Sequence, residues 1–171
     1  LFFWVRIFRL NRWVVPCERL VVSSVPARSD ACAEPDMVGI GGWWHPNPNV
    51  SLEEVDQAEV HWFHEPVSVA RLPFSHLLKP QQLTEPYRII AALELLAILV
   101  LLVLRQATSQ VVSAVVSQET DSMVCRFATK KWFSAKEPIA SILQELAWLC
   151  SSNRVELHIG HVAGASNEWA D

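Results

Sequence analysis

Valine-rich and glycine-rich stretches separated by turn signals dominate the first half of the chain and predict strands. The run at 19–31 favours a strand that ends near Asp30. A second strand is expected over 37–44, where glycines would permit close approach of a neighbouring backbone. A third, weakly marked strand is expected within 59–72, where Pro66 would limit it to an edge or an end of a sheet.

The second half of the chain shows apolar periods typical of helices, alternating with β-branched runs. Prolines mark the expected helix starts, because proline fits the first helical turn. In chain order, the pattern predicts a helix over 84–105, a buried strand over 110–121, an amphipathic helix over 137–152, a strand over 153–162 and the beginning of a further helix over 165–171. This order of elements implies an α/β fold in which helices pack on a mixed sheet.

The length of 171 residues is sufficient for one domain with its own core. We expect residues 1–19 to be a connector or the tail of a preceding region, and residues 20–171 to form the domain. Because the chain begins with Leu1 and stops at Asp171 inside a helical pattern, we expect a piece of a longer polypeptide, truncated at the start of its last helix. The four scattered cysteines argue against a zinc site or a disulfide framework.

The most apolar stretch, from Ile89 to Leu104, raises the question of a membrane. It is shorter than the ~20 residues that cross a bilayer, and it carries Glu94 in its interior. A buried helix and no membrane partner is the favoured interpretation, and a membrane-anchored protein is the alternative. The start of the chain does not read as a signal peptide, so we expect the cytoplasm or the nucleus as the compartment.

Four acidic residues stand on four different predicted elements: Asp30, Glu94, Asp121 and Asp171. Sites in α/β sheets form at the carboxyl ends of strands, so these carboxylates could converge. Clustered carboxylates repel one another unless divalent cations bind their oxygens. Taken singly, each acid has a structural or solvated alternative, which for Glu94 is a solvent-facing position or a pair with Arg88.

A basic and aromatic segment follows Asp121. Arg126, Lys130, Lys131 and Trp132 could grip a nucleic-acid backbone and stack on a sugar or base. The alternative is a solvated turn with one core aromatic. The net charge of −4 is not typical of nucleic-acid-binding proteins, but it is compatible with one whose acidic pocket is neutralised by metal ions.

Four stretches of the sequence together resemble the ribonuclease H domain of retroelement reverse transcriptases. They are SDACAEPDMVGIGGWW with Asp30, ALELLAIL with Glu94, VVSQETDS with Asp121, and HVAGASNEWAD with His161, Asn167 and Asp171. Each motif alone is weakly specific, whereas the ordered set is strong and covers about residues 20–171. The resemblance implies a three-layer ribonuclease H-like fold, with a mixed five-stranded sheet flanked by helices.

The same resemblance implies an endonuclease that cleaves the RNA strand of RNA–DNA hybrids with two Mg²⁺ or Mn²⁺ ions. Asp30 would bridge the two ions. Glu94 and Asp121 would hold the ion on the side of the attacking water, and Asp171 would hold the ion near the leaving 3′ oxygen. An upstream reverse transcriptase domain in the same polypeptide is implied as well.

Residues around the acids receive further roles from the resemblance. His161 would help to move protons or release product, and Asn167 and Glu168 would shape the site, with Ser122 in a positional role. The main alternative function is a catalytically inactive ribonuclease H-like module that serves as a structural or nucleic-acid-binding unit. A recombinase or integrase of similar fold is a further alternative, although these proteins usually lack the His-to-Asp ending.

Overall fold

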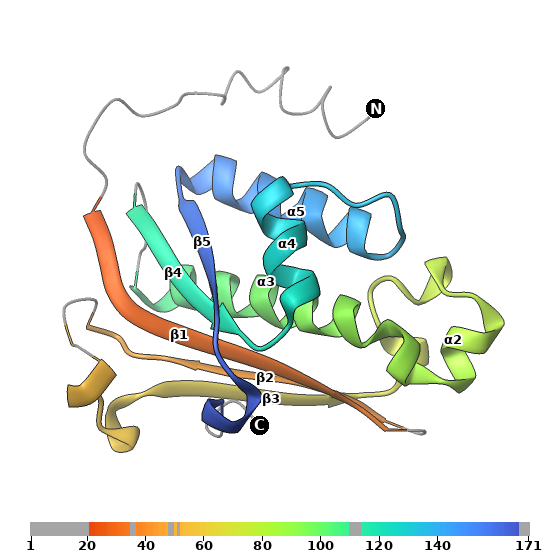
Figure 1. Ribbon diagram of the computed structural model, residues 1–171, viewed down its shortest axis with the longest axis horizontal. Helices are drawn as coiled ribbons and strands as arrows, with labels where there is room; N and C mark the ends of the chain where they lie inside the picture. Colours follow the sequence, from red (N-terminus) through yellow and green to blue (C-terminus); the bar gives the residue numbers. More distant parts are fainter. Residues whose placement is uncertain (1–20, 35–36, 48–49, 51, 110–113, 168–171) are drawn as a thin grey trace.

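Five strands form one mixed sheet: β1 (Val21–Ala33), β2 (Val38–Trp44), β3 (His61–Val67), β4 (Ala114–Thr120) and β5 (Glu156–His161). Their order across the sheet is β3-β2-β1-β4-β5 (Figure 1). The antiparallel pairs are β1–β2 and β2–β3, and the parallel pairs are β1–β4 and β4–β5. The structure is a computed structural model that describes residues 21–34, 37–47, 50, 52–109 and 114–167. The predicted mixed five-stranded sheet is confirmed.

Helices flank this sheet: α2 (Pro80–Thr84), α3 (Ile90–Ser109), α4 (Met123–Lys131) and α5 (Ile139–Asn153). α3 packs on β1 and β2, α5 packs on α3, and α4 contacts β5 and α3. Short 3-10 helices within the described residues are η1 (Leu52–Glu54), η2 (Gln57–Glu59), η3 (Val69–Arg71), η4 (Ser75–Leu77), η5 (Pro86–Ile89) and η6 (Gly164–Ser166). The helices cover the apolar side chains that the strands direct toward them.

α3 provides the centre of the hydrophobic core. Its fully buried side chains include Leu93, Leu95, Ile98 and Leu102, which pack with residues of the sheet and of α5. The helical stretch Pro86–Thr108 is long and apolar enough to cross a membrane by length and composition, but 56% of its most apolar window is buried inside this structure. The burial agrees with the interpretation of this helix as a core helix.

The predicted long helix over 84–105 differs from the observed elements at both ends. The chain forms α2 and then η5 before α3 begins, because Pro86 lacks the backbone N–H that a continuous helix needs. α3 then continues to Ser109, four residues beyond the expected end. The helix expected over 165–171 is observed only as η6 at its beginning, and residues 168–171 lie outside the described part of the chain.

α4 is a helix that the sequence pattern does not predict, since its basic residues indicate either nucleic-acid contacts or a solvated turn. The Ser122 hydroxyl caps its first turn by accepting a hydrogen bond from the Cys125 N–H at 3.4 Å. Trp132 ends it in the left-handed region with φ of 49°. This role of Ser122 agrees with the positional function expected for it.

Glycines of β2 allow its neighbours in β1 and β3 to approach closely. A Cβ atom on Gly42 would lie 2.7 Å from the Arg28 carbonyl oxygen and 2.9 Å from the Phe63 ring, so only glycine fits between these neighbours. β3 is an edge strand, as the position of Pro66 predicted.

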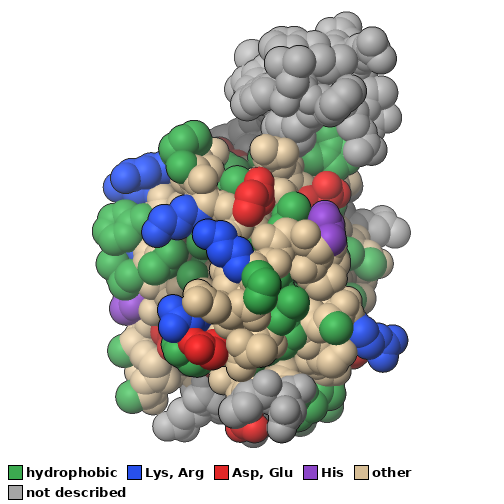
Figure 2. All heavy atoms as spheres, turned by 90° about the vertical axis from the view of Figure 1, so that its right-hand side faces the viewer, with side chains coloured by type: hydrophobic (Ala, Val, Ile, Leu, Met, Phe, Trp, Pro, Cys, Tyr) green, Lys and Arg blue, Asp and Glu red, His purple; other side chains and the backbone are tan. Residues whose placement is uncertain are grey.

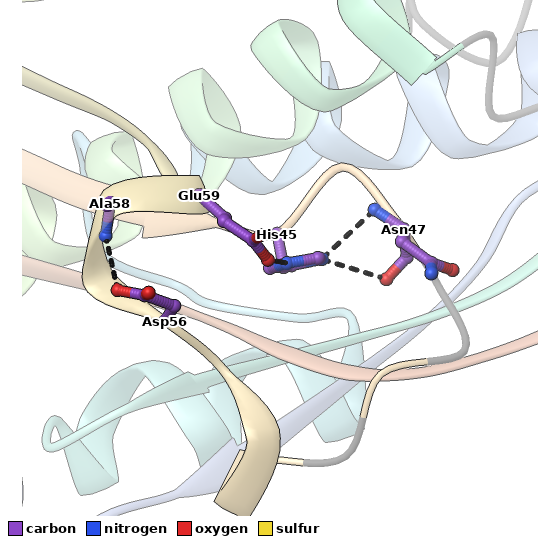
Figure 3. A network of polar contacts seen from close by, with 5 residues as sticks. All are labelled: His45, Asn47, Asp56, Ala58 and Glu59. Carbon is purple, nitrogen blue, oxygen red and sulfur yellow. Dashed lines mark hydrogen bonds and ion pairs between the residues drawn. The ribbon is translucent and has the colours of Figure 1, made fainter.

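A buried histidine holds the connection between β2 and β3 (Figure 3). His45 Nδ1 lies 3.1 Å from the Asn47 backbone nitrogen and 3.2 Å from the Asn47 carbonyl oxygen, and Nε2 lies 3.4 Å from a Glu59 carboxylate oxygen. Asp56 Oδ1 accepts the Ala58 N–H at 2.9 Å and caps η2. These bonds fix η2 beside the end of β2 and account for an otherwise irregular segment.

Candidate active site

Three of the four predicted acids meet in the structure. Asp30, Glu94 and Asp121 each offer a carboxylate oxygen, and these oxygens lie within 4.8 Å of one another. They come from β1, from α3 and from the residue that follows β4. The predicted convergence of these carboxylates is confirmed, and we call the group the acidic trio. Asp171 lies outside the described residues.

Strand register explains why two of these acids are neighbours. β1 and β4 are parallel, and Arg28 pairs with Glu119. Asp30 and Asp121 each follow this pair by two residues, and their carboxylates lie close together. Both acids lie toward the carboxyl ends of these two parallel strands. Functional sites in α/β proteins typically form at this end of the sheet.

Glu94 reaches the other two acids from the core helix. Its side chain is only 5% exposed, and it accepts a hydrogen bond from the Thr120 hydroxyl at 3.3 Å. Burial, followed by the negative charges of Asp30 and Asp121, raises the pKa of the Glu94 carboxyl to about 8. Both alternatives for Glu94, a solvent-facing position and a pair with Arg88, are therefore wrong, and Arg88 forms an ion pair with Glu85.

The donor set of the acidic trio fits a hard divalent cation. Its three carboxylates offer only oxygen ligands, which Mg²⁺ and Mn²⁺ prefer. Burial and mutual repulsion make the ionised form of Glu94 costly, and a bound cation offsets both effects.

The segment after β5 runs along the acidic trio. The Val162 N–H donates to the Thr120 carbonyl at 3.1 Å, directly before Asp121. Further along the segment, a Cβ atom on Gly164 would lie 3.3 Å from Asp121 Oδ2, so the backbone approaches this carboxylate closely. His161 is exposed at the end of β5 and pairs with Thr120 across the sheet. The candidate histidine thus lies at the same sheet edge as the acids.

Asn167 is also brought to this edge. It is fully buried, and its Nδ2 donates to the carbonyl of Ser29 at 3.5 Å, so it contacts β1 directly before Asp30. This position agrees with a residue that shapes the site. Glu168, its predicted companion, lies outside the described residues.

The candidate substrate-binding residues lie on and just after α4, which begins two residues after Asp121. Arg126, Lys130, Lys131 and Trp132 are all exposed. Trp132 is therefore not the core aromatic that the alternative interpretation required. From Ser122 to Lys136 the sequence contains no acidic residue, although the chain as a whole is acidic. On the face drawn in Figure 2, basic and hydrophobic side chains lie beside one another.

Two features of the site were missed in the sequence. One is the hydroxyl of Thr120, which holds Glu94. The other is an ion pair between Arg28 and Glu119, with 2.9 Å between Nε and Oε2. A signal for this pair was present, because Arg28 and Glu119 stand at equal distance before Asp30 and Asp121 and carry opposite charges.

Comparisons with known proteins identify the fold. No model of a known protein family matches the sequence, and no curated protein sequence matches it. Among solved structures, LC11-RNase H1 in complex with an RNA/DNA hybrid matches with a TM-score of 0.60 and 16% identity, over 86% of this chain and 91% of that chain. LC11-RNase H1 isolated from compost by a metagenomic approach matches with a TM-score of 0.59 and 16% identity, over 87% and 91%.

A third match extends the likeness to an archaeal protein. RNase H1 from the halophilic archaeon Halobacterium salinarum NRC-1 superposes with a TM-score of 0.56 and 13% identity, over 84% of this chain and 89% of that chain. The superpositions establish the fold. At sequence identities this low, the activity has to be argued from other observations. The chain therefore has the ribonuclease H fold, with a mixed five-stranded sheet flanked by helices.

Proposed function

We propose that this chain is a metal-dependent endonuclease that hydrolyses the RNA strand of RNA–DNA hybrids. The observation that carries the proposal is the acidic trio, whose carboxylate oxygens lie within 4.8 Å of one another at the sheet edge of a ribonuclease H fold. One structure with this fold holds an RNA/DNA hybrid. The ordered motifs around Asp30, Glu94, Asp121 and Asp171 support the same substrate.

In this proposal Asp30, Glu94 and Asp121 hold divalent cations, two Mg²⁺ or Mn²⁺ ions, with Asp171 as a further ligand. Such ions, when bound, activate a water molecule and stabilise the leaving oxygen of a phosphodiester. The Thr120 hydroxyl orients the Glu94 carboxylate, and burial of Glu94 excludes bulk water from one side of the site. Hydrogen bonds of this kind to a metal ligand typically fix its orientation.

His161 and α4 serve the substrate in this proposal. The exposed His161 at the end of β5 lies near the acidic trio and can donate or accept a proton there. Arg126, Lys130 and Lys131 bind phosphates of the hybrid, and Trp132 stacks on a sugar or base. The segment from Ser122 to Lys136 contains no acidic residue that would repel phosphates. Phosphates would therefore bind to this segment, and cations would bind to the acidic trio beside it.

The biological setting that we propose is a retroelement reverse transcriptase. Its support is the order of the sequence motifs, which resembles the ribonuclease H domain of such enzymes. A polymerase domain upstream in the same polypeptide would then supply the RNA–DNA hybrid, and the reaction would take place in the cytoplasm or the nucleus.

An assay with four end-labelled substrates tests the proposed activity. The full chain is incubated with an RNA–DNA hybrid, duplex RNA, duplex DNA and single-stranded RNA of one sequence, with Mg²⁺, with Mn²⁺ or with EDTA. We expect cleavage of the RNA strand of the hybrid only, and none with EDTA. Binding of the hybrid without cleavage at any metal concentration would contradict the proposal and favour an inactive nucleic-acid-binding module.

A further inference from the structure

We propose that Arg28 is a positioning residue, which holds the segment from Val162 to Asn167 against β1 and so keeps Gly164 beside Asp121. The inference rests on the proposed function, because it concerns the geometry of the same site. Arg28 itself does not belong to the acidic trio, and it acts through the backbone of this segment.

Arg28 is fixed by contacts to three different elements. Its side chain is 15% exposed, and its Nε forms the ion pair with Glu119 of β4. Its Nη1 donates to the carbonyl oxygen of Ser166, the last residue of η6, at 2.6 Å. The guanidinium carbon lies 5.8 Å from the centre of the Trp43 ring of β2. A planar guanidinium can make all three contacts at once, since its donors point in fixed directions.

The segment is attached at both ends to residues that directly precede an acid of the trio. At its start, the Val162 N–H is bonded to Thr120, which precedes Asp121. At its end, Asn167 is bonded to Ser29, which precedes Asp30. The Arg28 bond to Ser166 lies next to the Asn167 bond, which at 3.5 Å is long. Arg28 therefore supplies the shorter of the two side-chain bonds at this end.

Gly164 lies between the two attached ends of the segment, and its backbone lies next to the Asp121 carboxylate. With only 3.3 Å between a Cβ at this position and Asp121 Oδ2, a shift of the segment changes the space that is open around this carboxylate. Loss of the Arg28 bond would let the segment move toward or away from Asp121. Partners of this kind typically change metal affinity or activity by about tenfold to a hundredfold.

A purely structural role for Arg28 makes a different prediction. If Arg28 only joined β1 to β4 through Glu119, removal of either partner would have the same effect. The bond to Ser166 lies outside the sheet and uses Nη1, whereas the ion pair with Glu119 uses Nε. Glu119→Gln is therefore the matched control, because it removes the charge of the ion pair and retains both Arg28 and the Ser166 carbonyl.

The first readout is hydrogen exchange of the metal-free protein, and it does not depend on any activity. The amides of Ser166 and Asn167 are bonded to the carbonyls of Ala163 and Gly164 at 2.8 and 2.9 Å. We expect Arg28→Met to accelerate their exchange, with amides of α5 unchanged, and Glu119→Gln to resemble the wild type. Exchange in Arg28→Met at the wild-type rate would overturn the inference.

The second readout is the Mg²⁺ concentration that gives half-maximal cleavage of the hybrid. We expect this concentration to rise about tenfold or more in Arg28→Met and to remain near the wild-type value in Glu119→Gln. An unchanged value in Arg28→Met would overturn the inference. An inactive wild type would instead contradict the proposed function, and the hydrogen-exchange experiment would then decide the inference about Arg28. If Arg28→Met does not fold, the double variant Arg28→Met/Glu119→Gln replaces it, because it leaves no unpaired charge and still lacks a donor for the Ser166 carbonyl. Wild-type exchange in that double variant would overturn the inference.

Discussion

Replacement of Asp121 by asparagine is expected to reduce cleavage of the hybrid by roughly a hundredfold to a thousandfold, the range for loss of one group that stabilises transition-state charge. Asparagine has nearly the same shape but no negative charge, so it is a weak ligand for a hard cation. Asp121 is half-buried and follows β4, and the helix cap of α4 depends on Ser122 rather than on Asp121. The fold should therefore survive the substitution.

Initial rates on the labelled hybrid at saturating Mg²⁺ give the measurement, with circular dichroism as the check on folding. Glu145→Gln is a suitable control, since it removes one negative charge from the exposed face of α5, outside the proposed site. It should cleave at nearly the wild-type rate. A folded Asp121→Asn variant that cleaves as fast as the wild type would remove Asp121 from the mechanism.

The second large effect concerns the stability of the metal-free protein as a function of pH. The pKa of the Glu94 carboxyl is about 8 in the folded protein, against an ordinary value of 4.5. Between these two pH values, the folded state retains a proton that the unfolded state releases. The free energy of unfolding should therefore fall as pH rises from 4.5 to 8, by a few kcal/mol in total, and should change little through this group outside that window.

Glu94→Gln is expected to remove this dependence. The amide has no proton to lose in this range, and its oxygen can still accept the Thr120 hydrogen bond. At pH 8 without metal, the variant should be more stable than the wild type, because no ionised carboxylate is buried beside Asp30 and Asp121. With Mg²⁺, the wild type should recover stability and the variant should not.

Urea denaturation at pH 5, 6, 7 and 8, with EDTA and with Mg²⁺, provides both comparisons. Gln81→Ala, an uncharged change at an exposed position of α2, serves as the control and should retain the pH dependence of the wild type. If Glu94→Gln retains the pH slope of the wild type, another group is responsible for it. A wild type whose stability does not change between pH 5 and 8 would contradict the altered pKa of Glu94.

The acidic trio was accessible from the sequence because each of its members breaks a local pattern. Asp30 lies late in a valine-rich strand, Asp121 directly follows another, and Glu94 lies alone within an apolar helix. Burial of an isolated carboxylate is costly, so its presence predicted a partner or a metal. Parallel pairing of β1 with β4 then brings the first two together.

Other features depend on tertiary contacts that a local pattern does not contain. α4 is short and polar, and its ends are set by a Ser122 cap and by Trp132 in a left-handed conformation, with no glycine or proline to mark them. The alternative prediction that Glu94 pairs with Arg88 is wrong because Arg88 lies in η5, where it pairs with Glu85. Only the register of β1 and β4 shows that Arg28 faces Glu119, although their equal spacing from two acids is visible in the sequence.

The most direct test of the account is binding of Mn²⁺ by the folded protein, followed through the electron paramagnetic resonance signal of the free ion at pH 8. The account predicts that the wild type removes free Mn²⁺ from solution, that Mg²⁺ competes with it, and that Asp30→Asn and Glu94→Gln bind it far more weakly. A folded wild type that leaves the free Mn²⁺ signal unchanged would contradict the claim that these three carboxylates form a divalent metal site.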